Sequence, residues 1–166
     1  MRCLFLLLCL LFQPAAQAAG TYEETPYQAP KTLYEFYFDN PDYINSALYW
    51  LRSQINPLME PPYNMQPEDM KIIVLIHGTE IATVATKNYE KYKDAVDRMR
   101  YYASLGVDFR VCALAAGDYG YSVKDFQDFI KVVPSAMAEM SYWQQQGYAM
   151  ISPRILIRNQ SLESTR

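Results

Sequence analysis

The chain has 166 residues, of which 51% are hydrophobic and 20% charged, and its formal net charge at pH 7 is −3. This composition is typical of a globular protein rather than a disordered one, and the length suits one domain with its own core. A negative charge without any basic cluster argues against nucleic acid or anionic lipid as a partner.

The first 18 residues are expected to be an export signal that is cleaved. Arg2 supplies a positive start, Leu4–Phe12 is an apolar run, and Ala16-Gln17-Ala18 has the small-x-small form that signal peptidases cut. A membrane-spanning helix needs about 20 apolar residues, so this run is too short to be an anchor. We therefore predict a periplasmic or secreted protein without a membrane span.

The rest of the chain divides into a polar lead (19–32), one α/β domain (33–153) and a polar tail (154–166). Short apolar runs bounded by turn residues predict the strands of the domain. They are Leu33–Phe38, Ile72–Ile76, Asp108–Leu114, Ile130–Val133 and Tyr148–Ile151.

Amphipathic helices are expected between these strands. Asn40 caps the first, and Pro57 is expected to stop it. The second ends at Gly106, which favours a left-handed stop. The last opens at Ser135 and closes at Gly147. Strands that alternate with helices through short links predict right-handed crossovers and a mostly parallel sheet of about five strands with helices on both faces. We expect the flavodoxin-like strand order 2-1-3-4-5.

Cys112 is the candidate for chemistry. Cys3 and Cys9 would leave with the export signal, so Cys112 has no internal partner for a disulfide. It stands where the third strand runs out into the loop Ala115–Gly120, and ligands collect at the carboxyl ends of parallel strands. In an oxidising compartment this thiol would meet capping agents or a partner. The alternative interpretation is an inert packed thiol, because free cysteine is among the most buried residue types.

A nucleophilic cysteine must be accessible and largely thiolate, which requires a helix N-terminus or a nearby cation. A helix that opens near Ser122, with Asp125 completing a capping box, could lend its amide groups. Arg110 or Lys124 could lend positive charge. His77 and Tyr119 are expected to line the neighbourhood of Cys112, and the turn at Gly117 could admit a small sulfur ligand beside it.

His77, the only histidine, ends the second strand. In the expected strand order the first strand would separate His77 from Cys112 by about 10 Å, so a direct Cys-His dyad is not expected. A structural histidine bonded to the turn at Gly78–Glu80 is the favoured interpretation. One histidine and one cysteine cannot furnish the usual ligands of zinc, and no glycine-rich phosphate loop is present, so we expect neither a metal nor a cofactor.

Four segments resemble the DsrE/DsrF-like sulfur-relay family, in a secreted or periplasmic branch: Ile72–Gly78, Ala103–Cys112, Val132–Glu139 and Gln146–Ala149. The resemblance implies a small α/β domain whose cysteine after the third strand, here Cys112, carries sulfur as a persulfide. It also implies assembly as trimers or hexamers. Many members of this branch have an asparagine shortly after the cysteine, whereas Ala113–Ala116 follow here. An amide contact to bound sulfur would then have to come from elsewhere.

We therefore expect a sulfur carrier or sulfur-compound-binding protein that exchanges sulfur with a small sulfur compound or with a donor or acceptor protein. Two alternatives stay open. In the first, the chain is a non-catalytic homo-oligomeric binding or assembly module, built from faces rich in its 15 tyrosines and from the loop at 57–70, with Cys112 as packing. In the second, it is a redox enzyme that forms a mixed disulfide with an external partner.

Overall fold

The structure is a computed structural model that describes residues 20–157 and 159–166. The predicted export signal lies outside the described residues. Within the described part of the chain, no helix is long and apolar enough to cross a membrane.

Five parallel strands form one sheet in the order β4-β3-β2-β1-β5. They are β1 (Lys31–Phe36), β2 (Lys71–Ile76), β3 (Asp108–Cys112), β4 (Ile130–Val133) and β5 (Ala149–Ile151). The prediction of a single α/β domain with a parallel sheet is confirmed. The flavodoxin-like order is wrong, because β2 rather than β1 lies beside β3. The first four strands are neighbours in chain order. β5 breaks this order, because it lies at the opposite edge of the sheet, beside β1.

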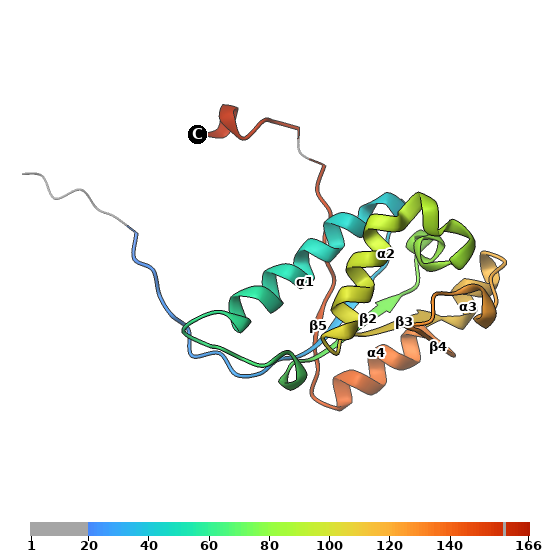
Figure 1. The fold of residues 1–166 in the computed structure, drawn as a ribbon, viewed down its shortest axis with the longest axis horizontal. Helices are drawn as coiled ribbons and strands as arrows, with labels where there is room; N and C mark the ends of the chain where they lie inside the picture. The colour runs from blue at the N-terminus through green and yellow to red at the C-terminus, as the bar shows by residue number, and fades with distance from the viewer. Residues whose placement is uncertain (1–19, 158) are drawn as a thin grey trace, which may run out of the picture.

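In the described part of the chain, four α-helices connect or follow these strands: α1 (Ile44–Met59), α2 (Tyr89–Ser104), α3 (Ala113–Asp118) and α4 (Ala136–Gln145). Figure 1 shows α1 and α2 side by side on one face of the sheet and α4 on the other. Right-handed crossovers explain this division. The connections from β1 to β2 and from β2 to β3 advance in one direction across the sheet, whereas the connection from β4 to β5 runs back, so its helix covers the opposite face.

The main core lies between the sheet and the two long helices. Alternate strand residues point toward these helices, as the period of a strand requires. Its fully buried side chains include Phe36, Val74, Ile76, Phe109, Val111, Leu48, Leu51, Val96 and Met99. This face is closed by apolar packing.

The start of α1 follows the prediction and its end does not. Asn40 caps the preceding 3-10 turn, Pro41–Tyr43, because its Oδ1 accepts the backbone N–H of Asp42 at 2.9 Å. The helix was expected to stop at Pro57 but continues to Met59. A proline this near the end of a helix removes a single backbone donor, and the extra turn buries Leu58 in the core.

The segment after Cys112 also differs from the prediction. It was expected to extend the strand to Leu114 and then form a loop, but β3 ends at Cys112 and α3 begins at once. Alanine and leucine are strong helix formers, which explains the early start. Gly120, with φ of 75°, then turns the chain back. The capping box of Ser122 and Asp125 is present, on the 3-10 turn Val123–Asp125.

A buried carboxylate ties together the carboxyl ends of β1 and β2. Glu80 is fully buried and accepts backbone N–H groups from Phe38 at 3.0 Å, His77 at 3.2 Å and Gly78 at 2.9 Å. Burial raises the pKa of Glu80, against the opposing effect of these hydrogen bonds. Gly78 must be a glycine, since a Cβ there would lie 2.5 Å from the backbone nitrogen of Phe38. The loops that follow the two strands are therefore held rigidly together.

Candidate functional site

The face covered by α4 carries a smaller core and two of the predicted site residues, Cys112 and His77. Its buried cluster is Leu33, Ile73, Leu75, Cys112, Val133, Ala136 and Met140. Because side chains two residues apart share a face, Glu35 and His77 lie on this side as well, beyond Leu33 and Leu75. The ten-residue helix α4 shields less of the sheet than the two helices opposite.

Cys112 ends β3 directly below the first turn of α4. Its side chain is buried, with 5% of the residue exposed, and its Sγ accepts the backbone N–H of Ala136 at 3.3 Å. Ser135 caps the same helix by accepting the N–H of Ala138. A helix N-terminus stabilises negative charge on a nearby sulfur. The amide near the thiol therefore comes from α4, not from the turn at Ser122 as predicted.

His77 is bonded to Glu35 of the neighbouring strand. The Nε2 of His77 lies 3.2 Å from Oε1 of Glu35, and its ring stacks on Tyr37 with 4.6 Å between centroids. Burial lowers the pKa of His77, although the charge and hydrogen bond of Glu35 act in the opposite direction. The imidazole is therefore neutral near pH 7, and its Nε2–H donates to Glu35. The second oxygen of Glu35 accepts the hydroxyl of Ser152 at 2.5 Å.

The strand order brings His77 next to Cys112. Ile76 pairs with Val111, so the next residues of the two strands are neighbours at the carboxyl edge of the sheet. Adjacent strands lie about 4.8 Å apart, so the expected separation of about 10 Å is wrong. No hydrogen bond joins the two side chains in the described structure, because the imidazole is directed to Glu35 and the sulfur to Ala136.

The His77 side chain does form a hydrogen bond, but its partner differs from the predicted one. Its imidazole bonds to Glu35 of β1 rather than to the turn at Gly78–Glu80. Only its backbone N–H reaches that turn, where it donates to the carboxylate of Glu80.

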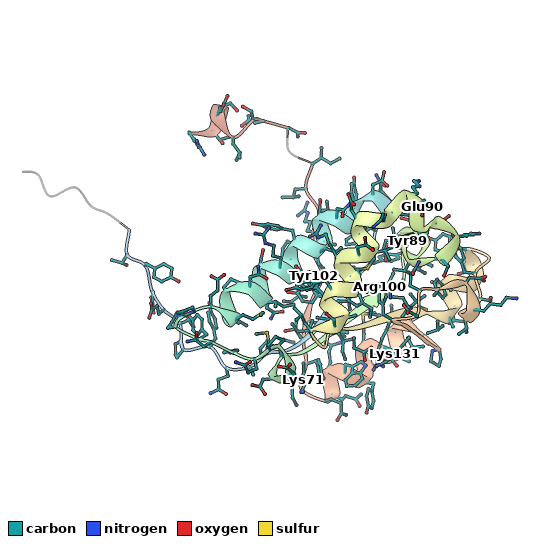
Figure 2. All side chains as sticks on the ribbon, viewed as in Figure 1. Lys71, Tyr89, Glu90, Arg100, Tyr102 and Lys131 are labelled. Carbon is teal, nitrogen blue, oxygen red and sulfur yellow. The ribbon has the colours of Figure 1, made fainter. Side chains whose placement is uncertain are left out.

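Arg110 does not supply charge to Cys112, although both side chains lie on this face. Its guanidinium donates to Asp108 at 2.7 and 3.1 Å and to Glu139 at 2.8 Å, and it lies over the ring of Trp143. Burial acts to lower the pKa of Arg110, but the two carboxylates outweigh it and the pKa is raised. Lys131 of β4, labelled in Figure 2, also donates to Asp108. These groups form a polar cluster that anchors α4.

Tyr119 and Gly117 occupy different surroundings from Cys112. Tyr119 follows α3 and lines a pocket of about 530 Å³ that Tyr37 also lines. Neither Cys112 nor His77 lines this pocket. Gly117 is an exposed residue inside α3. A Cβ there would meet nothing within 4 Å, so packing within the protein does not require a glycine at this position.

Sequence reasoning missed Glu35, Tyr37, Ser152 and the amide of Ala136. Glu35 carried one signal, since it is the single charged residue of the apolar and aromatic run Leu33–Phe38. The other contacts join residues far apart in the chain. In residues 20–157 and 159–166, no three His, Cys, Asp or Glu side chains are grouped as a metal site would need.

Comparisons with known proteins agree with this architecture. A protein from Methanobacterium thermoautotrophicum, titled as protein of unknown function MTH1491, has a similar structure with a TM-score of 0.59. The alignment covers 75% of this chain and 99% of that chain at 16% sequence identity, which supports the fold alone. A search of curated proteins found no match. The model of the DsrE/DsrF-like family matches residues 35–153. This chain therefore belongs to the DsrE/DsrF-like family.

Proposed function

We propose that this chain is a sulfur-relay protein in which Cys112 accepts a sulfur atom from a small sulfur compound or a donor protein and holds it as a persulfide. The observation that carries the proposal is the placement of the Cys112 sulfur 3.3 Å from the N–H of Ala136, at the N-terminus of α4. Family membership supports the same role.

The proposed step is an exchange between two sulfur–sulfur bonds. The Cys112 thiolate attacks the terminal sulfur of a persulfide or polysulfide donor, a new S–S bond forms, and the donor's S–S bond breaks. The donor thiolate leaves with the electron pair, and a persulfide anion stays on Cys112. The N–H of Ala136 and the dipole of α4 offset its charge.

Formation of the thiolate requires a proton acceptor, and His77 is the neighbouring candidate. It is neutral because it is buried, and Glu35 stabilises the imidazolium that proton transfer creates. The contact requires the Cys112 side chain to turn from Ala136 toward Nδ1 of His77, while Nε2 of His77 stays bonded to Glu35. His77 thus assists the thiol by proton transfer, while Glu35 is a positioning residue.

Access to the sulfur requires a small movement at the surface. Cys112 is 5% exposed, but Leu114, two residues on, and Met137, next to Ala136, are both more than half exposed. Leu114 in the first turn of α3 and Met137 in the first turn of α4, here called the rim, are thus exposed residues close in sequence to Cys112 and to its amide donor Ala136. We propose that the sulfur donor reaches Cys112 slowly, when the residues of this rim move aside.

The same proposal includes export through residues 1–18 and assembly into a homo-oligomer. Large side chains are exposed on and around α4, notably Met137, Tyr142 and Met150, which gives this face an apolar surface for a second copy. The reactive face and the assembly face would then coincide.

Mass spectrometry of the purified protein after exposure to polysulfide, tetrathionate or thiosulfate tests the sulfur step. We expect adducts on the wild type, with a one-sulfur increase from polysulfide, no adduct on Cys112→Ser, and slower formation on His77→Gln. Urea-unfolded protein serves as the control for thiol competence. Adducts on the unfolded chain but none on the native chain, or equal adducts on Cys112→Ser, would overturn the proposal.

A second function is favoured by the burial of the same sulfur. Because Cys112 is packed and already accepts a hydrogen bond, it would also suit a non-catalytic homo-oligomeric module. In that case Cys112→Ala leaves the oligomer intact by light scattering, and maleimide labels the native thiol only as fast as the protein unfolds. Labelling much faster than unfolding excludes this second function.

A further inference from the structure

A pocket of about 530 Å³ lies at the carboxyl edge of the sheet, apart from the Cys112 sulfur. Segments that follow β1, β2, β5 and the helix after β3 line it. Ligands of open parallel sheets bind at this edge, and small-molecule pockets have volumes of about 300–1,000 Å³. The pocket is thus placed and sized for a small ligand.

Two opposite charges line this pocket without pairing. Asp39 follows β1 and Arg154 follows β5, and neither forms an ion pair or hydrogen bond with the other or with another described residue. Arg110 and Arg100, by contrast, are both paired with acidic side chains. The pocket therefore offers one unpaired carboxylate and one unpaired guanidinium, on segments that follow the neighbouring strands β1 and β5.

Three tyrosines also line the pocket. The hydroxyls of Tyr37, Tyr43 and Tyr119 have no hydrogen-bond partner in the part of the chain that the structure describes, so each is free to bond to a ligand. Two of the rings are held by aromatic neighbours. Tyr37 stacks on His77, and Tyr43 packs edge-on against Phe38. The walls of the pocket are thus partly preorganised.

We propose that this pocket binds a small zwitterion of the amino-acid class, with its carboxylate at Arg154 and its ammonium group at Asp39. A simple anion would be repelled by Asp39 and a simple cation by Arg154, whereas a ligand with both charges satisfies both. Guanidinium groups bind carboxylates through paired hydrogen bonds, and tyrosine rings attract ammonium groups. The proposal goes beyond the sulfur step and does not use the sulfur of Cys112.

The test is a titration of the Cys112→Ser protein, followed by the amide NMR signals of residues around the pocket, including Thr79. The probes are glycine, L-glutamine and L-methionine, with methionine ethyl ester as the cation-only analogue and N-acetyl-methionine as the anion-only analogue. We expect saturable shifts with at least one zwitterion at about millimolar affinity, and binding of the methionine analogues at least about tenfold weaker than that of the best zwitterion.

Two variants assign the charges. Asp39→Asn is expected to relieve the rejection of N-acetyl-methionine, and Arg154→Gln that of the ethyl ester. Asp69→Asn and Arg52→Gln, which remove exposed charges elsewhere, are the matched controls and should bind as the parent does. The proposal is overturned by the absence of saturable shifts with every zwitterion, by equal binding of the single-charge analogues, or by variants at the pocket that behave like the controls. Because Cys112 is absent throughout, such a failure would leave the sulfur step untouched.

Discussion

The two faces of the sheet are built differently. One is closed by α1 and α2, each of 16 residues, and most of its strand residues are apolar and buried. The other is covered by α4 of ten residues and holds charged, ionisable and nucleophilic side chains among its apolar ones. The difference follows from topology, since three crossovers advance across the sheet and a single one returns. We expect the buried residues of the first face to supply most of the free energy of unfolding. The ionisable and nucleophilic side chains of the proposed site lie on the second face.

The largest expected effect tests whether the face under α1 and α2 supplies most of the stability. Leu51→Ala removes a fully buried side chain of α1 and should destabilise the protein by about 2–5 kcal/mol. Leu114→Ala, at the exposed rim beside Cys112, is the matched control and should change stability by less than about 0.5 kcal/mol. Urea unfolding followed by circular dichroism measures both. Equal losses would show that the two faces are not distinct in this respect.

An intermediate effect is expected for the polar cluster that anchors α4. Arg110→Met leaves the carboxylates of Asp108 and Glu139 without their main partner and should cost about 2 kcal/mol. Arg100 of α2, labelled in Figure 2, pairs with the exposed Asp128, so Arg100→Met should cost less than about 1 kcal/mol. A double-mutant cycle with Glu139→Gln should show coupling for Arg110 alone. No coupling there would remove the cluster as the anchor of α4.

The smallest expected effect is the pH dependence contributed by His77. Burial lowers its pKa in the folded state below the ordinary 6.5, so below that pH the unfolded chain binds the proton more readily. Stability from this group is complete above pH 6.5 and is lost as the pH falls through the lowered folded pKa. Unfolding free energies of wild type and His77→Gln, measured from about pH 7.5 to about pH 5, should therefore converge in acid. A constant difference would mean that His77 does not titrate in this way.

Local patterns in the sequence were sufficient to predict the type and order of the main helices and strands, and the place of the cysteine near the end of a strand. Asn40, Ser135 and the pair Ser122 and Asp125 cap their turns as expected, because capping depends on residues within one helical turn. Cys112 lies at the carboxyl end of the third strand, although the apolar run had predicted two more strand residues, to Leu114. The local errors at Pro57 and Ala113 concern where helices end and begin, which neighbouring packing decides.

The strand order and the partners in the site were decided by the tertiary structure. Whether β1 or β2 lies beside β3 depends on which crossovers reverse, and no short segment encodes that choice. The contacts of His77 with Glu35, and of Cys112 with Ala136, join residues 42 and 24 positions apart. Residue types and local periodicity determined which groups could react, but only the folding of distant segments onto one face determined which of them meet.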